Sequence, residues 1–410
     1  MEVTRMASFY IKQSNLIDDL CYKSKNIYND ANYIIKQEFK RSGMWVRYNQ
    51  LFHIVKELDS YKVVGSNVGQ ATLRVLDRNW KSFFSAIKVC GKRRKEFLGT
   101  PKPPKYLDYN GRFPLIIDNI KFRIINGYIY FSWSVLKPLN NTFNVSWIRN
   151  ITKLCEIRFI PMGVGYKMEL VYQTETPECD SGINRVVGID FGLANFVTMV
   201  NNIGEKPIIV KGGVLKSINQ YYNKKRSKIQ EELRTKNQKS KSKSLSRLTL
   251  KRNEKIASFM HRCSKWLVDY CVLYDIDTMI VGKNDGWKQE SKMSRIVNQS
   301  FVQIPTARFI EMLRYKCQNN GIRLIETEES YTSKASFLDN DEIPTFKEGK
   351  DATFSGKRIK RGMYQSSNGT LINADVNGAY NIIRKAIPKI FDGIEGVGLH
   401  PVQKKFAQTV

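Results

Sequence analysis

The stretch Val186-Val187-Gly188-Ile189-Asp190-Phe191-Gly192-Leu193 sets the fold expected for the second half of this chain. Its apolar run is typical of a strand that is buried on both faces. The run ends at Asp190 and then at a glycine turn, so it places a carboxylate at the edge of a sheet. A carboxylate in that position can hold a divalent cation. Asp190 is therefore the first candidate functional residue.

A second carboxylate lies in Asn373-Ala374-Asp375-Val376-Asn377, just ahead of a helical pattern. Two ordinary alternatives stay open at this point. Asp190 is also a good turn former, and Asp375 a good helix N-cap.

The charge of the chain indicates a polyanionic partner. The sequence has 410 residues, 42% of them hydrophobic and 26% charged, as in globular proteins of two or more domains. Its 67 Lys and Arg exceed its 38 Asp and Glu, and the net charge of +29 attracts phosphate backbones or anionic membranes. No apolar run is long enough to span a bilayer, and the first residues resemble no signal peptide. We therefore expect nucleic-acid partners and no membrane.

Cysteine and histidine usage narrows the chemistry. The seven cysteines are scattered, odd in number and never spaced as C-x-x-C, which favours reduced thiols in a cytoplasmic protein over disulfides or a zinc ribbon. With only three histidines, a histidine-rich metal site or a Ser-His-Asp triad has little material.

The order of patterns in the second half predicts an RNase H-like α/β fold. The expected elements are a strand hairpin, a long basic helix pair, a buried strand, an amphipathic helix, a strand and a final helix that begins near Asp375. They cover residues 186–200, 224–270, 278–281, 309–317, 322–325 and 375–390.

The first third reads as helices followed by strands. One amphipathic helix carries Arg74, Arg78 and Lys81 on its polar face, which is either solvated charge or a surface for RNA. A Pro/Lys-rich stretch with Lys102 and Lys105 ends the helical pattern. Strands are expected at 120–125 and 128–133 around the hairpin signal Asn126-Gly127, and at 154–160 and 166–172. This part is expected to be a small β-barrel or sheet that a helical insertion interrupts.

Two-metal phosphodiester hydrolysis requires carboxylates that bridge two divalent ions about 3.5–4 Å apart. Asp190 and Asp375 supply two, and the third is harder to assign. An RNase H-like site usually takes it from the strand at 279–281, where this chain continues with Gly282, and Asp285 falls in a predicted loop. The alternative is the acidic cluster at the end of the next strand, Glu326, Glu328 and Glu329.

Several spaced motifs resemble TnpB, the transposon-encoded RNA-guided DNA nuclease related to type V CRISPR effectors and to Fanzor. The resemblance covers nearly the whole chain. The motifs are the stretch 184–192, Leu-Thr-Leu-Lys-Arg-Asn-Glu-Lys-Ile at 248–256, Ser-Tyr-Thr-Ser-Lys at 330–334, and Asn-Ala-Asp-Val-Asn-Gly-Ala-Tyr-Asn-Ile at 373–382.

The resemblance implies a domain organisation. A wedge-like β-barrel would take residues 1–10 and 96–178, with a helical recognition insertion at 11–95 and a linker at 179–184. A RuvC nuclease domain would take 185–334 and 372–390, interrupted by a target-nucleic-acid-binding segment at 335–371, and 391–410 would be a mobile tail. A guide RNA would pair with double-stranded target DNA, and the protein would read a short flanking motif.

The resemblance also bears on the metal site. Many members carry the third acid where Gly282 stands, but a branch shared with Fanzor carries it just before the Tyr-Thr-Ser-Lys element. Glu329 matches that position, with Glu328 in reserve, so Asp190, Glu329 and Asp375 would be the catalytic residues and the ligands of two Mg²⁺ ions. Most members have a four-cysteine zinc ribbon, but residues 335–371 contain no cysteine, and we expect no zinc.

Further basic residues are candidate contacts to nucleic acid. Lys251 and Arg252 lie in the basic helix pair, and Lys334 ends the Tyr-Thr-Ser-Lys element. The segment 335–371 contributes Lys357, Arg358, Lys360 and Arg361.

The leading hypothesis is an RNA-guided DNA endonuclease of a mobile element, in the cytoplasm of a prokaryotic cell and at the nucleoid when bound to DNA. The first alternative is a nuclease-inactive RNA-guided repressor, which the glycine at 282 favours. The second is a RuvC-type nuclease without a guide, against which the large basic N-terminal half weighs. The sequence does not indicate an oligomeric state.

Overall fold

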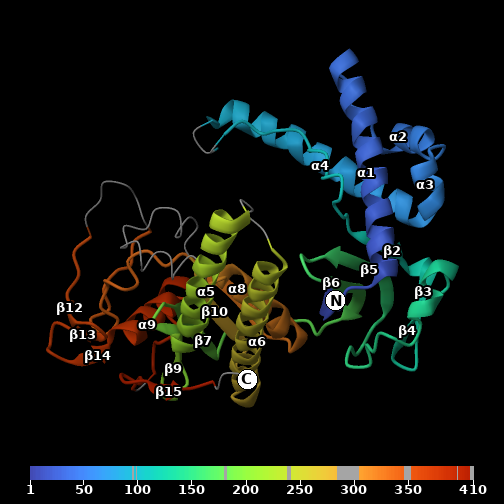
Figure 1. Cartoon of the computed structure of the whole chain (residues 1–410). Helices are drawn as coiled ribbons and strands as arrows, with labels where there is room; N and C mark the ends of the chain where they lie inside the picture. Colours follow the sequence, from blue (N-terminus) through green and yellow to red (C-terminus); the bar gives the residue numbers. More distant parts are fainter. Residues whose placement is uncertain are drawn as a thin grey trace. The chain divides into compact units, whose positions relative to one another are not determined.

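A computed structural model describes residues 1–94, 97, 99–179, 182–237, 242–283, 304–345, 352–394 and 396–406. The chain divides into two compact units, Glu2–Glu175 and Thr176–Val410, the second of which includes Met1. Figure 1 shows both. Asp285, one candidate for the third acid, lies outside the described residues.

The first unit packs helices beside an antiparallel sheet. The long helices α1 and α4 are in contact along a shared apolar stripe, and the indole of fully buried Trp80 on α4 donates to Asn32 Oδ1 on α1 at 3.0 Å. Burial of these apolar stripes stabilises both segments as helices. The helices are α1 (Asn15–Ser42), α2 (Tyr48–Val55), α3 (Asp59–Val64), α4 (Ser66–Lys92) and the 3₁₀ turns η2 (Asn119–Lys121) and η3 (Ser134–Leu139).

The strands of this unit form an open sheet of order β1-β6-β5-β2 and a separate hairpin, β3-β4. The turn at Asn126-Gly127 is confirmed, with φ of 50° and 78° at its two residues. The expected barrel is not confirmed, because β3 and β4 pair with each other and not with the larger sheet. The strands are β1 (Glu2–Ile11), β2 (Leu115–Asp118), β3 (Phe122–Ile125), β4 (Tyr128–Phe131), β5 (Lys153–Pro161) and β6 (Tyr166–Glu175).

A mixed sheet of order β11-β10-β7-β8-β9-β15 forms the centre of the second unit. β8 is antiparallel to β7 and β9, whereas β10 and β11 run parallel to β7. The sequence predicted β7, β8, β10 and β11 in this order along the chain, but it did not predict β9. The strands are β7 (Val186–Phe191), β8 (Asn195–Asn201), β9 (Ile208–Lys211), β10 (Thr278–Gly282), β11 (Arg323–Thr327) and β15 (Val402–Lys404).

Helices cover both faces of this sheet, as alternation along β7 requires. Val187 and Ile189 belong to one apolar cluster together with residues of α6 and α8, whereas Val186 belongs to another cluster that includes α9. Asp190 is two residues from Gly188, which contacts α9, so it also faces α9. The helices are α5 (Gly213–Asn237), α6 (Lys243–Leu273), α8 (Thr306–Asn319) and α9 (Ala374–Ala386).

The inserted segment forms a three-stranded sheet of order β12-β13-β14 immediately before α9. Its strands are β12 (Lys357–Lys360), β13 (Met363–Gln365) and β14 (Leu371–Asn373).

The expectation of a mobile tail after residue 390 is wrong. β15 pairs in parallel with β9, and Phe406 stacks edge-on against Phe259 and Trp266, with ring centroids 5.9 and 6.2 Å apart. β15 thus covers the edge of β9, which would otherwise stay unpaired. Among the described residues, no helix has the length and apolar character needed to cross a membrane.

Close packing of α9 on β7 depends on Gly188. A Cβ there would lie 2.4 Å from Ile383 Cγ1 and 2.8 Å from the backbone oxygen of Ala379. We expect Gly188→Ala to lower the free energy of unfolding by about 1–3 kcal/mol, because the helix must move away from the strand. Thermal unfolding measures the change. Gly213→Ala is the matched control, since a Cβ at that position would meet nothing within 4 Å, and equal stability of both variants would contradict the expectation.

Candidate active site

Asp190 lies inside β7, not in the turn that follows. Its register partner on β8 is Thr198, so the turn-former alternative is wrong. A Cβ on Gly378 of α9 would lie 3.5 Å from Asp190 Oδ2, which shows how closely the helix passes over this carboxylate. The apolar strand and the glycines at the crossing thus place a half-buried acid between sheet and helix.

Asp375 is the second residue of α9 and does not cap it. The cap is Asn373, whose Oδ1 accepts from the backbone N–H groups of Asp375 and Val376 at 3.0 and 3.2 Å. The N-cap alternative for Asp375 is therefore wrong. Its side chain lies where the helix dipole favours negative charge. Its carboxylate accepts a hydrogen bond from Asn195.

Glu329 occupies the space that a side chain at position 282 would fill. A Cβ on Gly282 would lie 2.7 Å from Glu329 Oε2 and 2.6 Å from Ile382 Cδ1. β10 and β7 run in parallel register up to the pair Val281 and Ile189, so Gly282 is level with Asp190. The carboxylate of Glu329 thus reaches the end of β10 from the loop after β11.

The other two acids of the cluster have partners elsewhere. Glu328 accepts from Lys385 Nζ and from the backbone N–H of Ser330. Burial raises the pKa of Glu328, but these hydrogen bonds outweigh burial and the pKa lies below its ordinary value. Glu326 forms ion pairs with Lys283 and Arg314. Of the three candidates, Glu329 is the one whose negative charge raises the pKa of Asp190.

Burial and like charge raise the pKa values of Asp190 and Glu329. The pKa of Asp190 is well above its ordinary value, first because of burial and then because of the negative charges of Glu329 and Asp375. Burial, followed by the charge of Glu328, raises the pKa of Glu329 to about 7. A divalent cation would relieve this repulsion.

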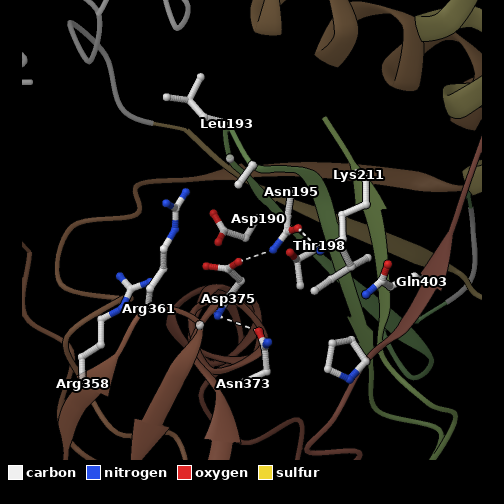
Figure 2. Close-up of a pocket in the computed structure, with 15 residues that line it drawn as sticks. Asp190, Leu193, Asn195, Thr198, Lys211, Arg358, Arg361, Asn373, Asp375 and Gln403 are labelled. Carbon is white, nitrogen blue, oxygen red and sulfur yellow. Dashed lines mark hydrogen bonds between the residues drawn. The ribbon is translucent and has the colours of Figure 1, made fainter. Parts of the chain in front are cut away.

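Asp190 and Asp375 line one cleft of about 640 Å³ (Figure 2). Arg358 and Arg361 line it as well, and the positive charge of Arg358 lowers the pKa of Asp190. Glu329 is not among the lining residues. The cleft therefore combines two carboxylates with two guanidinium groups, as a site for a phosphodiester requires.

Asn195 is a site residue that the sequence analysis missed. Its Nδ2 donates to Asp375 Oδ2 at 2.6 Å, and its Oδ1 accepts from Lys211 Nζ at 3.0 Å (Figure 2). Its position at the start of β8, just after the glycine turn that follows Asp190, could have identified it in the sequence. Lys211 fixes the amide orientation, and the amide fixes the carboxylate of Asp375.

The donors suit a hard cation such as Mg²⁺, which prefers carboxylate oxygens. Within the ranges that the structure describes, no group of three His, Cys, Asp or Glu side chains is arranged so that it could hold a metal ion as it stands. The fit rests on the chemistry of the acids and on the repulsion that Glu329 and Asp375 exert on Asp190.

The predicted nucleic-acid residues of the second unit separate into two kinds. Lys251, Lys334, Lys357, Arg358, Lys360 and Arg361 are exposed. Arg252 instead donates to Asn219 Oδ1 from two nitrogens, at 2.9 and 2.7 Å, and lies over the ring of Tyr222. Arg252 thus joins α6 to α5, and its contact with phosphate stays a prediction.

In the first unit, Arg74, Arg78 and Lys81 line a second cleft of about 880 Å³, together with Arg47 and Tyr48. Lys81 pairs with Asp77 at 2.7 Å. Lys102 and Lys105 are exposed on the extended stretch after α4. A groove with cations and an aromatic ring is the kind of surface that binds nucleic acid.

The raised pKa of Glu329 makes a prediction for the metal-free protein. A carboxyl whose folded pKa exceeds its unfolded value costs stability as pH rises from about 4.5 to about 7, and the cost is constant above that range. We expect the free energy of unfolding to fall on the order of 3 kcal/mol between these limits because of Glu329. In Glu329→Gln this part of the fall should disappear, as thermal unfolding in a chelating buffer series would show. An unchanged pH profile would contradict the burial of this acid beside its neighbours.

Comparison with known proteins gives two family matches. Residues 169–288 match the OrfB_IS605 model, described as a probable transposase, and residues 307–382 match the Cas12f1-like TNB domain. No curated protein matches the chain.

Two solved structures are similar to this chain. One, a Cas12f1-sgRNA-target DNA complex, is 14% identical, with a TM-score of 0.50 over 89% of this chain and 81% of that one. Another, the mini-RNA-guided endonuclease CRISPR-Cas_phi3, is 10% identical, with a TM-score of 0.49 over 96% of this chain and 94% of that one. The first likeness identifies a mixed α/β fold of the Cas12f type. With the two family matches in their expected places, the resemblance of this chain to the TnpB family is confirmed.

Proposed function

We propose that this protein is an RNA-guided DNA endonuclease that cleaves target DNA beside a short flanking motif. The observation that carries the proposal is the cleft in which Asp190 and Asp375 face Arg358 and Arg361. A carboxylate whose pKa is raised by burial and by neighbouring acids, as that of Asp190 is, is unfavourable in an ordinary fold, so a functional reason for its retention is expected.

The sheet supports a RuvC-type assignment of the second unit. An antiparallel run of β7, β8 and β9, followed by parallel β10 and β11 and by a helix that carries an acid, is the order of an RNase H-like domain. The proposal assigns the helices and sheet of the first unit to guide-RNA and flanking-motif recognition.

Asp190, Asp375 and Glu329 would hold two Mg²⁺ ions. Such ions supply an activated water and stabilise the leaving oxygen of a phosphodiester. The other residues bind and orient. Arg358 and Arg361 would bind phosphates of the target strand, and Asn195 keeps the carboxylate of Asp375 in place.

The guide RNA and the target duplex are the proposed partners. A net charge of +29 favours both, and binding should weaken steeply with salt. We place the protein in the cytoplasm of a prokaryotic cell, in association with a mobile element.

The repressor alternative depended on the missing acid at Gly282. Since Glu329 lies over that position, the glycine no longer argues for a lost site. The guide-free nuclease alternative predicts that the purified protein carries no RNA of discrete length.

Removal of either cleft acid should abolish cleavage. We expect Asp190→Asn and Asp375→Asn to reduce cleavage of a target duplex by the guide complex by at least about 100-fold, because each removes a metal ligand. Gel analysis of DNA products in Mg²⁺ measures it, and binding in Ca²⁺ should be retained.

Asp392→Asn is a matched control, because Asp392 is exposed and is not among the residues that line the cleft. Sequence-specific binding without cleavage by the unaltered protein would support the repressor, and cleavage of branched DNA without RNA would support the guide-free nuclease.

A second prediction exchanges the position of the third acid. Glu329→Ala should lose cleavage at least about 100-fold, and Gly282→Glu in that background should restore part of it, because both side chains reach the same place. Gly282→Gln with Glu329→Ala has nearly the same size without the charge and should stay inactive. Equal activity of the Glu and Gln double variants would show that a carboxylate at position 282 cannot replace that of Glu329.

A further inference from the structure

The hairpin β12-β13 brings two arginines to the cleft. Arg358 lies on β12, and Arg361 follows at the tip. All four residues of β12 are exposed, whereas β13 is anchored by buried Tyr364 and by its pairing with β14. The exposed leg that carries Arg358 therefore needs further contacts to fix its position.

Two carboxylates hold the two legs of this hairpin at its open end. Ser355 precedes β12, and its Oγ and N–H donate to Asp341 at 2.6 and 3.1 Å. Ser367 follows β13, and its N–H donates to Asp339 at 2.9 Å, as does its Oγ. Burial raises the pKa of Asp339, but the hydrogen bonds from Ser336 and Ser367 outweigh it and the pKa is lowered. These bonds therefore favour the charged form.

The loop that carries both carboxylates is fixed to α9. Arg384 Nη1 donates to Asn340 Oδ1 at 2.7 Å, and Nη2 donates to the backbone oxygen of Asp341 at 2.6 Å. Asp375 lies on the same helix. One chain of contacts thus runs from the helix of a site acid, through the loop, to both legs of the hairpin.

We propose that Asp339 and Asp341 are positioning residues that set Arg358 and Arg361 over the carboxylate cleft for binding of the DNA backbone. The proposal rests on the proposed function of the cleft. Residues 335–371 contain no cysteine, so no disulfide or thiolate-bound metal does this work. Charge-assisted hydrogen bonds to backbone N–H and hydroxyl groups are strong enough to order a short hairpin.

The test is a mutant cycle on the guide-loaded protein. One arm is Asp339→Asn with Asp341→Asn, the second is Arg358→Ala with Arg361→Ala, and the third combines all four. Binding of target duplex is measured in Ca²⁺ at several salt concentrations. We expect the first two arms to lose similar affinity, each reducing the magnitude of the slope of log affinity against log salt by about 2. The combined variant should lose little more affinity than either arm alone.

Hydrogen exchange gives an independent readout. In the aspartate variant, amide protons of 357–365 should exchange about tenfold faster or more, while those of β7 and α9 should not change. Asp392→Asn should change neither exchange nor binding. Because the aspartate variant could fail to fold, Ser355→Ala with Ser367→Ala removes the hydroxyl donors alone and should shift both readouts in the same direction by less.

The proposal would be overturned if the affinity losses of the two arms were additive in the combined variant. Faster exchange of the hairpin with unchanged DNA binding would also overturn it. Both readouts are independent of cleavage. A protein that does not cut DNA but shows the non-additive cycle would refute the proposed nuclease and keep this inference. A protein that cuts DNA with an additive cycle would do the reverse.

Discussion

The negative charge gathered around half-buried Asp190 is the constraint on which the candidate site of the second unit depends. Asp190 lies between sheet and helix, and its pKa is raised first by burial and then by the charges of Glu329 and Asp375. The close contacts that bring these charges together depend on glycines in the strands and the helix. Gly188 and Gly378 let α9 lie close on β7, and Gly282 leaves the room that Glu329 takes. The fold therefore concentrates negative charge at one place, where a cation would be stabilising.

α9 organises the cleft from both of its ends. Its first turn carries Asp375, whose carboxylate Asn195 and Lys211 hold in one orientation. Its last turn carries Arg384, which fixes the loop under the β12-β13 hairpin. The acids and the arginines of the cleft thus share one frame, although they come from segments that are far apart in the sequence. Such preorganisation matters for phosphodiester chemistry, because positive groups must already be in place when charge develops.

The acidic site contrasts with the rest of a strongly basic chain. A net charge of +29 draws a polyanion toward the protein without regard to its sequence. Acids near the site that take no part in it are paired with cations, as Glu326 and Glu328 are. Specificity then has to come from elsewhere, and base pairing with a guide is a source that needs no base-reading side chains at the cleft.

Local patterns determined much of this protein. The apolar run into Asp190, the amphipathic helices and the Asn126-Gly127 turn were predicted because each depends on neighbouring residues alone. The sequence also narrowed the third acid to one short cluster. Tertiary structure decided what local patterns cannot contain. It paired Glu328 with Lys385 and placed Glu329 over Gly282, it brought Asn195 to Asp375, and it made a strand of Val402–Lys404. A strand of three residues is too short to show an alternating pattern in the sequence, and it forms only because β9 pairs with it. The role of a carboxylate depends on its partner, which comes from a segment far away in the sequence.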